Sequence, residues 1–172
     1  KKILDQPKTV KELVVMARTQ FWAEVYNKGV AQFNLYRNGK PDVKDLLLQT
    51  SINTFITSYE IKPDEAQSYL MLSTCLFLAG DELESEKYII KAVELSPDDA
   101  NINLTAGQIF MQKQELEQAL PYIKKSVELD PSNTKSIRNL AQIYYDTGNM
   151  EKSIETYEDA INKETDRKVK AD

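Results

Sequence analysis

The fold is decided by two consecutive stretches of 34 residues, AQSYLMLSTCLFLAGDELESEKYIIKAVELSPDD (66–99) and ANINLTAGQIFMQKQELEQALPYIKKSVELDPSN (100–133). Each stretch ends in a turn that carries a proline, Pro97 or Pro131. Small residues recur at the same step, here and in the residues that follow: Ser73, Gly107 and Ala141; Ser85, Ala119 and Ser153; Ala92, Ser126 and Ala160. Large apolar residues recur between them: Leu76, Phe110 and Tyr144; Ile89, Ile123 and Tyr157. A fixed period of this length predicts a solenoid of stacked helix pairs, because one unit alone cannot bury its apolar face.

This pattern resembles the tetratricopeptide repeat (TPR), in which small residues stand where helices cross and bulky ones fill the spaces between them. The resemblance covers Ala66 to about Asn162. It implies an all-α, TPR-type α-solenoid of antiparallel helix pairs forming a right-handed superhelix. It also implies a scaffold that holds other proteins, since such domains serve in bacterial secretion, pilus and lipoprotein systems and in cytoplasmic complexes.

Each clear repeat is expected to form a helix, a short turn, a second helix and a proline-bearing turn. Gly80-Asp81 and Gly148-Asn149 are typical of the short turns, and Pro97 prevents a helix from continuing. The expected helices are 66–79, 83–95, 100–112, 116–129, 134–147 and 150–162. Pro121 lies inside the fourth of them and cannot donate to Glu117, so that helix must begin near Leu116.

The region before Ala66 is predicted to be a divergent relative of the repeat. Counting back one period from Pro97 reaches Pro63, and Gly29 is predicted to lie at a close helix crossing. A strong turn signal at Arg37–Asp42 indicates a longer helix pair than in the other repeats. The predicted organisation is an N-terminal tail (1–9), an N-terminal helix with a divergent helix pair (10–65), three repeats (66–99, 100–133, 134–162) and a charged C-terminal tail (163–172).

The N-terminal helix is predicted to start with a capping box, Thr9-Val10-Lys11-Glu12. Apolar residues then recur at helical spacing, which predicts one helix from about Val10 to Arg37, or two helices broken near Arg18-Thr19. Its early part is expected to pack on the stack as an N-terminal cap. Residues 1–7 and 163–172 are expected to be poorly ordered.

The composition of the chain argues against some classes of function. The chain has 172 residues and a net charge of −5, from 22 basic and 27 acidic residues, without the basic footprint that nucleic acid binding leaves. No apolar run approaches the roughly 18 residues that span a bilayer, so no direct membrane span is expected. The chain opens without Met or an apolar signal segment, and we interpret it as an excised or processed fragment. The compartment stays open: cytoplasmic, or extracytoplasmic if a signal or lipid anchor was removed.

Catalysis is not expected from the residue types present. The chain contains no His, the commonest general base and metal ligand, and its one cysteine, Cys75, is predicted to be a small buried apolar residue. Glu82, Glu84 and Glu86 alternate along a helix start, so they point to different faces and do not form an acid–base pair. Neither a phosphate-binding loop nor a metal-spaced cluster is present. We therefore expect no enzyme activity, metal or cofactor.

The family resemblance implies a concave groove lined by the first helix of each repeat. The implied groove residues are Gln67, Leu70, Met71, Thr74, Phe77 and Leu78 from the first repeat; Asn101, Leu104, Thr105, Gln108, Met111 and Gln112 from the second; and Lys135, Arg138, Asn139, Gln142, Tyr145 and Asp146 from the third. These residues grade from apolar to polar and cationic. An extended peptide with an apolar anchor and an acidic or carboxylate end would suit this surface, because Arg and Lys form charge-assisted hydrogen bonds to carboxylates.

Simpler interpretations of these residues remain open. Lys135 and Arg138 stand three apart on an exposed helix face and are also consistent with solvated surface charge. The apolar residues of the first repeat are also consistent with a surface covered by the N-terminal helices. Some chaperone-binding TPR domains use a clamp of Lys, Asn and Arg for EEVD tails. Here its places hold Leu70, Thr74, Thr105 and Asn139, and only Lys135 fits, so we predict that EEVD-type tails are not bound.

A second hypothesis is a structural or self-associating subunit, for example of a bacterial envelope or secretion complex. The last repeat exposes a surface built for a successor, and the residues after Asn162 are too polar to cover Ile143, Ile154, Tyr157 and Ile161 fully. We therefore expect either that the natural protein continues beyond Asp172 or that this end packs on another copy, giving a homo-oligomer through the C-terminal end.

Overall fold

The computed structural model describes the backbone of residues 9–171 and the side chains as far as Asn162. Within that range the chain is helical and forms no strand. The helices are α1 (Val10–Asn38), α2 (Pro41–Ile61), α3 (Ala66–Leu78), α4 (Glu82–Leu95), α5 (Ala100–Gln112), α6 (Leu116–Leu129), α7 (Thr134–Asp146) and α8 (Met150–Ala171). The expectation for residues 1–7 lies outside the described residues.

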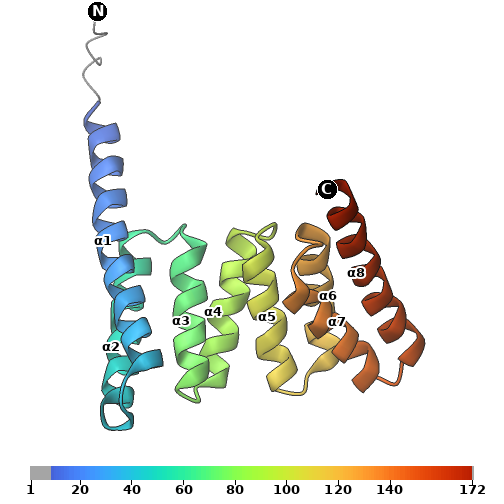
Figure 1. The fold of residues 1–172 in the computed structure, drawn as a ribbon. Coiled ribbons are helices and arrows are strands. Elements are labelled where there is room, and N and C mark those ends of the chain that lie inside the picture. The colour runs from blue at the N-terminus through green and yellow to red at the C-terminus, as the bar shows by residue number, and fades with distance from the viewer. Residues whose placement is uncertain (1–8, 172) are drawn as a thin grey trace, which may run out of the picture.

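The helix pairs stand side by side in one row, with α1 and α8 at its two ends (Figure 1). Each helix packs on its successor in the chain, and the first helices of the pairs also approach one another directly: α1 with α3, α3 with α5 and α5 with α7. In the described part of the chain, the backbones of α2, α4, α6 and α8 do not approach one another in this way. The row therefore has an inner face formed by α1, α3, α5 and α7, in the all-α, TPR-type solenoid that the family resemblance implies.

The turn inside each repeat has the same hydrogen bonds. The N–H groups of Asp81, Glu115 and Asn149 donate to carbonyl oxygens five residues earlier, at 3.0, 2.9 and 2.7 Å. This closure requires a left-handed residue just before the donor, and the φ values there are +84° at Gly80, +62° at Gln114 and +78° at Gly148. The middle repeat thus makes the turn without glycine, in a conformation that costs an L-residue energy.

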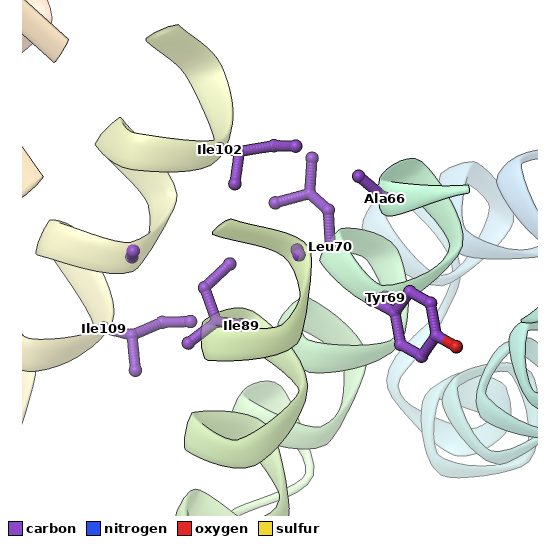
Figure 2. Packing of buried hydrophobic residues seen from close by; sticks show 8 residues of the cluster. Ala66, Tyr69, Leu70, Ile89, Ile102 and Ile109 are labelled. Atoms are coloured by element: carbon purple, nitrogen blue, oxygen red, sulfur yellow. The ribbon is translucent and has the colours of Figure 1, made fainter. Parts of the chain in front are cut away.

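The core is continuous along the row because each cluster of buried residues joins two neighbouring repeats. The cluster in Figure 2 combines side chains of α3, α4 and α5, among them Leu70, Ile89, Ile102 and Ile109, all of which are 4% exposed or less. A second cluster joins α5 and α6 to α7, and a third joins α2 to α3. Stacking therefore buries the apolar stripe that each pair would otherwise expose.

Helices approach most closely at the small residues of the period. A Cβ added at Gly107 would stand 2.4 Å from both Cγ1 and Cδ1 of Ile123, and Ile123 and Ala119 are fully buried. In the first repeat the Ser73 and Ser85 hydroxyls each donate to the other residue's carbonyl oxygen, at 2.7 and 2.9 Å. The small residues therefore allow close packing, and the serines among them also form hydrogen bonds across the crossing.

Serine pairs also join one repeat to the next. The hydroxyl groups of Ser58 and Ser68 lie 2.8 Å apart between α2 and α3, and those of Ser126 and Ser136 lie 2.7 Å apart between α6 and α7. All four residues are fully buried. Because each hydroxyl has a partner, these contacts avoid the cost of a buried polar group without a hydrogen bond.

The N-terminal pair, α1 and α2, is longer than the other pairs, and only part of its length packs on α3. α1 is one unbroken helix, begins with the predicted Thr9–Glu12 capping box and passes α2 closely at Gly29, where an added Cβ would stand 2.7 Å from the Phe55 ring. The Trp22 indole N–H donates to Ser68 Oγ at 2.9 Å and so links α1 to α3.

The prediction that the early part of α1 caps the stack is wrong. Every residue from Val10 to Arg18 is exposed, and in Figure 1 this part of the helix extends beyond the other helices. α1 has 29 residues and its antiparallel partner α2 has 21, so the extra two turns of α1 have no helix beside them.

The C-terminal helix also differs from the prediction. α8 continues to Ala171 instead of ending at Asn162, so the tail expected to be poorly ordered has helical backbone as far as that residue. Ile143 is fully buried, whereas Ile154, Tyr157 and Ile161 are 52%, 43% and 63% exposed. In the described part of the chain, the outer face of α8 is therefore open.

Candidate partner-binding surface

The predicted groove residues lie on α3, α5 and α7, which contribute to the inner face. Direct approach of these three helices brings the residues onto one side of the row. Their accessibility rises along it: most residues from α3 and α5 are buried or half-buried, whereas most from α7 are exposed. The structure thus separates the predicted set into packing residues and accessible ones.

On α3, most of the predicted residues take part in packing. Leu70 is only 4% exposed and belongs to the core, so it is not available to a partner. Met71 and Phe77 are half-buried against core clusters, and the Gln67 amide donates to Asp99 at 3.2 Å. Leu78 is 47% exposed and is the most accessible apolar side chain of this group. Thr74, also half-buried, donates to the carbonyl oxygen of its own helix at Leu70.

α5 offers a mainly polar strip. Leu104 is 4% exposed and packs between α5 and the following repeat, so it too belongs to the core. Asn101 and Gln112 are exposed, Gln108 and Met111 are half-buried, and the Thr105 hydroxyl donates to the Asn101 carbonyl oxygen at 2.9 Å. The middle of the inner face therefore presents amide groups beside a thioether.

α7 is the open part of the predicted surface. Lys135, Arg138, Gln142 and Tyr145 are all exposed. Neither Lys135 nor Arg138 forms an ion pair with any side chain as far as Asn162, although the Gln142 amide donates to Asp146 at 2.8 Å. Asn139 is half-buried, and its Nδ2 has no hydrogen-bond partner in the described chain. The cations are thus available to an anionic ligand.

A hollow that the sequence analysis missed lies on the other side of the row. It has a volume of about 520 Å³ and is lined by Tyr69, Lys87, Tyr88, Ile90, Lys91 and Glu94. The Tyr59 and Tyr69 rings stack at 5.2 Å between centroids, and Tyr88 lies beside both. The available signal was the group of tyrosines on three successive helices, Tyr59 on α2, Tyr69 on α3 and Tyr88 on α4. Lys87 and Lys91 already pair with Glu84 and Glu94, so this hollow offers less unpaired charge than α7.

Cys75 and the glutamates at the start of α4 have packing or surface roles. Cys75 is fully buried, as predicted, and burial raises the pKa of its thiol to about 12. Glu84 pairs with Lys87 on the same helix, while Glu86 pairs with Lys113 of the neighbouring repeat and Glu82 is exposed. Across the described residues, no three acidic or cysteine side chains are placed to hold a metal ion. No described helix has the length and apolar character needed to cross a bilayer.

Comparisons with known proteins agree with this geometry. Sequence profiles of the tetratricopeptide repeat match residues 66–99, 83–134 and 110–171, which together span more than half of the chain. The chain belongs to the tetratricopeptide repeat family, and its repeats make it a protein-interaction scaffold. Among proteins with curated descriptions, no sequence is significantly similar.

Several solved structures share the fold. MamA from Desulfovibrio magneticus RS-1 (residue 41 to its end) is 17% identical with a TM-score of 0.69, over 84% of this chain and 76% of that one. PilF from Pseudomonas aeruginosa is 13% identical with a TM-score of 0.72, over 85% of this chain and 62% of that one. The first TPR of Spaghetti (RPAP3), bound to the HSP90 peptide SRMEEVD, is 18% identical with a TM-score of 0.65, over 75% and 94%.

Proposed function

We propose that this protein binds an extended peptide segment, or a partner helix, along the inner face from α3 to α7. The ligand places an apolar side chain near Leu78 and Phe77 and an acidic or carboxylate end at Lys135 and Arg138. The observation that carries the proposal is this pair of exposed cations on α7, since neither has an anionic partner in the described chain.

The residue types between the two ends suit a peptide backbone. Gln108 on α5 and Asn101 near its start carry amides that both donate and accept, and neither side chain is fully buried. At the α7 end, Arg138 can form two parallel hydrogen bonds with a carboxylate, and Lys135 supplies a second charge one turn away. Tyr145, 55% exposed, adds an apolar ring with a hydroxyl group at the same end.

The spacing of the helices sets the length of the ligand. Packed helices lie about 8–10 Å apart, so the two steps from α3 to α7 span roughly 20 Å. Leu78 ends α3, whereas Lys135 lies in the first turn of α7 and corresponds to Gln67 in α3, so the two ends are also displaced by about 16 Å along the helix axis. The diagonal is about 26 Å, and an extended chain that advances about 3.3 Å per residue needs about eight residues to reach from Leu78 to Lys135. Shorter peptides cannot contact both ends at once.

A library of nine-residue peptides with free C-terminal carboxylates tests the proposal. The tightest peptide is measured by fluorescence anisotropy against the parent and against Lys135→Glu/Arg138→Glu. We expect the double reversal to weaken binding at least tenfold, because a loss of about 1.4 kcal/mol is already tenfold and two charge-assisted contacts are removed. Binding to the parent should weaken from 50 to 500 mM salt, since exposed charges are screened.

Controls separate the site from net charge. Lys124→Glu/Lys125→Glu makes the same charge change on α6, outside the inner face, and should alter affinity less than twofold. The same peptide with an amidated C-terminus should bind weakly, and SRMEEVD should not bind, because the clamp positions hold Leu70, Thr74, Thr105 and Asn139. Unaltered affinity of Lys135→Glu/Arg138→Glu would refute the proposed orientation and move the site toward Phe77.

A further inference from the structure

The free end of α1 is an apolar surface outside the stack. α1 is eight residues longer than α2, which at 1.5 Å per residue leaves about 12 Å of helix beyond its partner. On this segment Val10, Leu13 and Val14 are 78%, 52% and 52% exposed. Exposed apolar residues gathered in this way mark an interaction surface more often than scattered single ones do.

Part of this segment forms a defined stripe. Val10, Val14, Ala17 and Phe21 recur at helical spacing and share one face of α1. Val14, Ala17 and Phe21 line an open hollow of about 560 Å³ together with Glu60 and Ile61, where α1 passes the end of α2. A helix lying against this stripe would therefore contact both α1 and the last turn of α2.

The opposite end of the row carries a stripe with the same spacing. Met150, Ile154 and Tyr157 on α8 stand at the same intervals as Val10, Val14 and Ala17, and they are 52%, 52% and 43% exposed. Beside them is a hollow of about 190 Å³ between α7 and α8, lined by Ala141, Gln142, Tyr145, Ser153 and Tyr157. The hollow offers a place for a side chain from a docking helix.

The two stripes differ in the charge that flanks them. From Val10 to Arg18, α1 carries two basic residues and one acidic residue, and Glu60 of α2 lines the same hollow, so this end is close to neutral. From Met150 to Asn162, α8 carries four acidic residues and one lysine. Repulsion between these acidic residues disfavours contact of α8 with another α8, whereas the α1 end has no excess of acidic residues to repel α8.

The two ends belong to different molecules in any such contact, because α1 and α8 stand at opposite ends of the row (Figure 1). We propose that copies of this chain associate head to tail, the free end of α1 in one copy packing on the outer face of α8 in the next. A contact of this kind joins two different surfaces, so it repeats along a chain of copies unless the rotation closes a ring. The contact adjoins the inner face only at Gln142 and Tyr145 of α7, which also line the hollow beside α8.

Association is expected to be weak and concentration-dependent. The contact involves only about three turns of each helix, less than the 1,200–2,000 Å² buried in a standard stable interface. Sedimentation velocity of the whole chain from 10 to 500 µM should therefore show a weight-average mass that rises steadily past that of a dimer. A parent that stays monomeric at 500 µM would overturn the proposal.

Complementation between variants tests the head-to-tail arrangement. Val10→Glu/Val14→Glu alters α1, and Met150→Glu/Ile154→Glu alters α8; circular dichroism checks that each keeps its helicity. Each variant alone should remain monomeric at 500 µM. Their equimolar mixture should form a 1:1 dimer and nothing larger, because only one pair of intact surfaces is left. Association of the α1 variant alone would indicate contact between α8 helices, and association of the α8 variant alone would indicate contact between α1 helices; either result overturns the proposal.

Cross-linking provides a test that does not require the contact to be weakened. In a Cys75→Ser background, Val14→Cys with Ile154→Cys should oxidise to a ladder of dimers, trimers and longer species. Each single-cysteine variant should give at most a faint dimer. A strong dimer from Ile154→Cys alone, or from Val14→Cys alone, would contradict head-to-tail packing. Mixing the two single-cysteine variants should restore a dimer and no ladder.

Discussion

Each repeat reverses direction through one residue with a positive φ, and the three residues give a test of what this turn costs. At Gly80 and Gly148 an added Cβ would meet no atom within 4 Å, so Gly→Ala changes only the backbone preference there. Placing a residue other than glycine in the left-handed region costs about 1–2 kcal/mol of folding free energy. Part of this cost is offset because Ala has less conformational freedom than Gly in the unfolded chain. Gly80→Ala and Gly148→Ala should each lower the free energy of unfolding by about 1 kcal/mol.

Gln114 should respond in the opposite direction. Its φ of +62° places a Cβ-bearing residue in the same turn, so Gln114→Gly should raise the free energy of unfolding by about 0.5–1 kcal/mol. Thermal and urea unfolding followed by circular dichroism measure the change, and 1 kcal/mol corresponds to roughly 2–4 °C for a chain of this size. The control Gln112→Gly lies in the last turn of helix α5 and should destabilise. If Gln114→Gly also destabilised, the left-handed turn between α5 and α6 would be refuted.

The remaining predictions concern two core residues, Ala119 and Cys75. Ala119→Leu should cost roughly 1–3 kcal/mol or more by overpacking, since Ala119 is fully buried beside Gly107, and an unchanged melting temperature would contradict the crossing described here. Cys75 should resist a thiol reagent in the native protein and react once urea unfolds it, which the labelling rate measures. The thiol has a pKa of about 12 in the folded protein against an ordinary value of 9.0, so between these pH values its ionisation favours the unfolded chain. The free energy of unfolding should therefore fall as the pH rises from about 9 toward 12. Cys75→Ala should lose that part of the alkaline decline.

The repeat period predicted most helix boundaries because turn residues and prolines recur with it. Helices 100–112 and 116–129 were placed to the residue, and α6 begins at Leu116 as predicted, with Pro121 inside it. The small residues were correctly placed at close crossings, since size alone decides how near two helices approach. Their hydroxyl partners could not be predicted, because a serine at a crossing has several carbonyl and hydroxyl oxygens within reach and only packing selects one.

The binding surface was less predictable than the fold. The family pattern assigns the same positions of each first helix to the groove, yet Leu70 and Leu104 are buried because neighbouring first helices approach directly. The equivalent position in the third repeat is Arg138, which stays exposed. The position of a residue in the repeat therefore does not by itself decide whether it is buried in the core or exposed in the groove. The type of side chain and the helix that follows along the row decide this as well.

Equivalent positions of the repeat differ in burial between the interior of the row and its ends. Ile89, Ile123 and Tyr157 occupy the same place in successive repeats, but the first two are fully buried and Tyr157 is 43% exposed. The difference arises because a following pair covers Ile89 and Ile123, whereas no described element follows α8 in the row. A polar substitution on the α8 stripe therefore removes less buried area than one at Ile123, and the same holds for Val14 on α1. Loss of association with little loss of stability is consequently the result that distinguishes an interaction surface at these ends from one more layer of core.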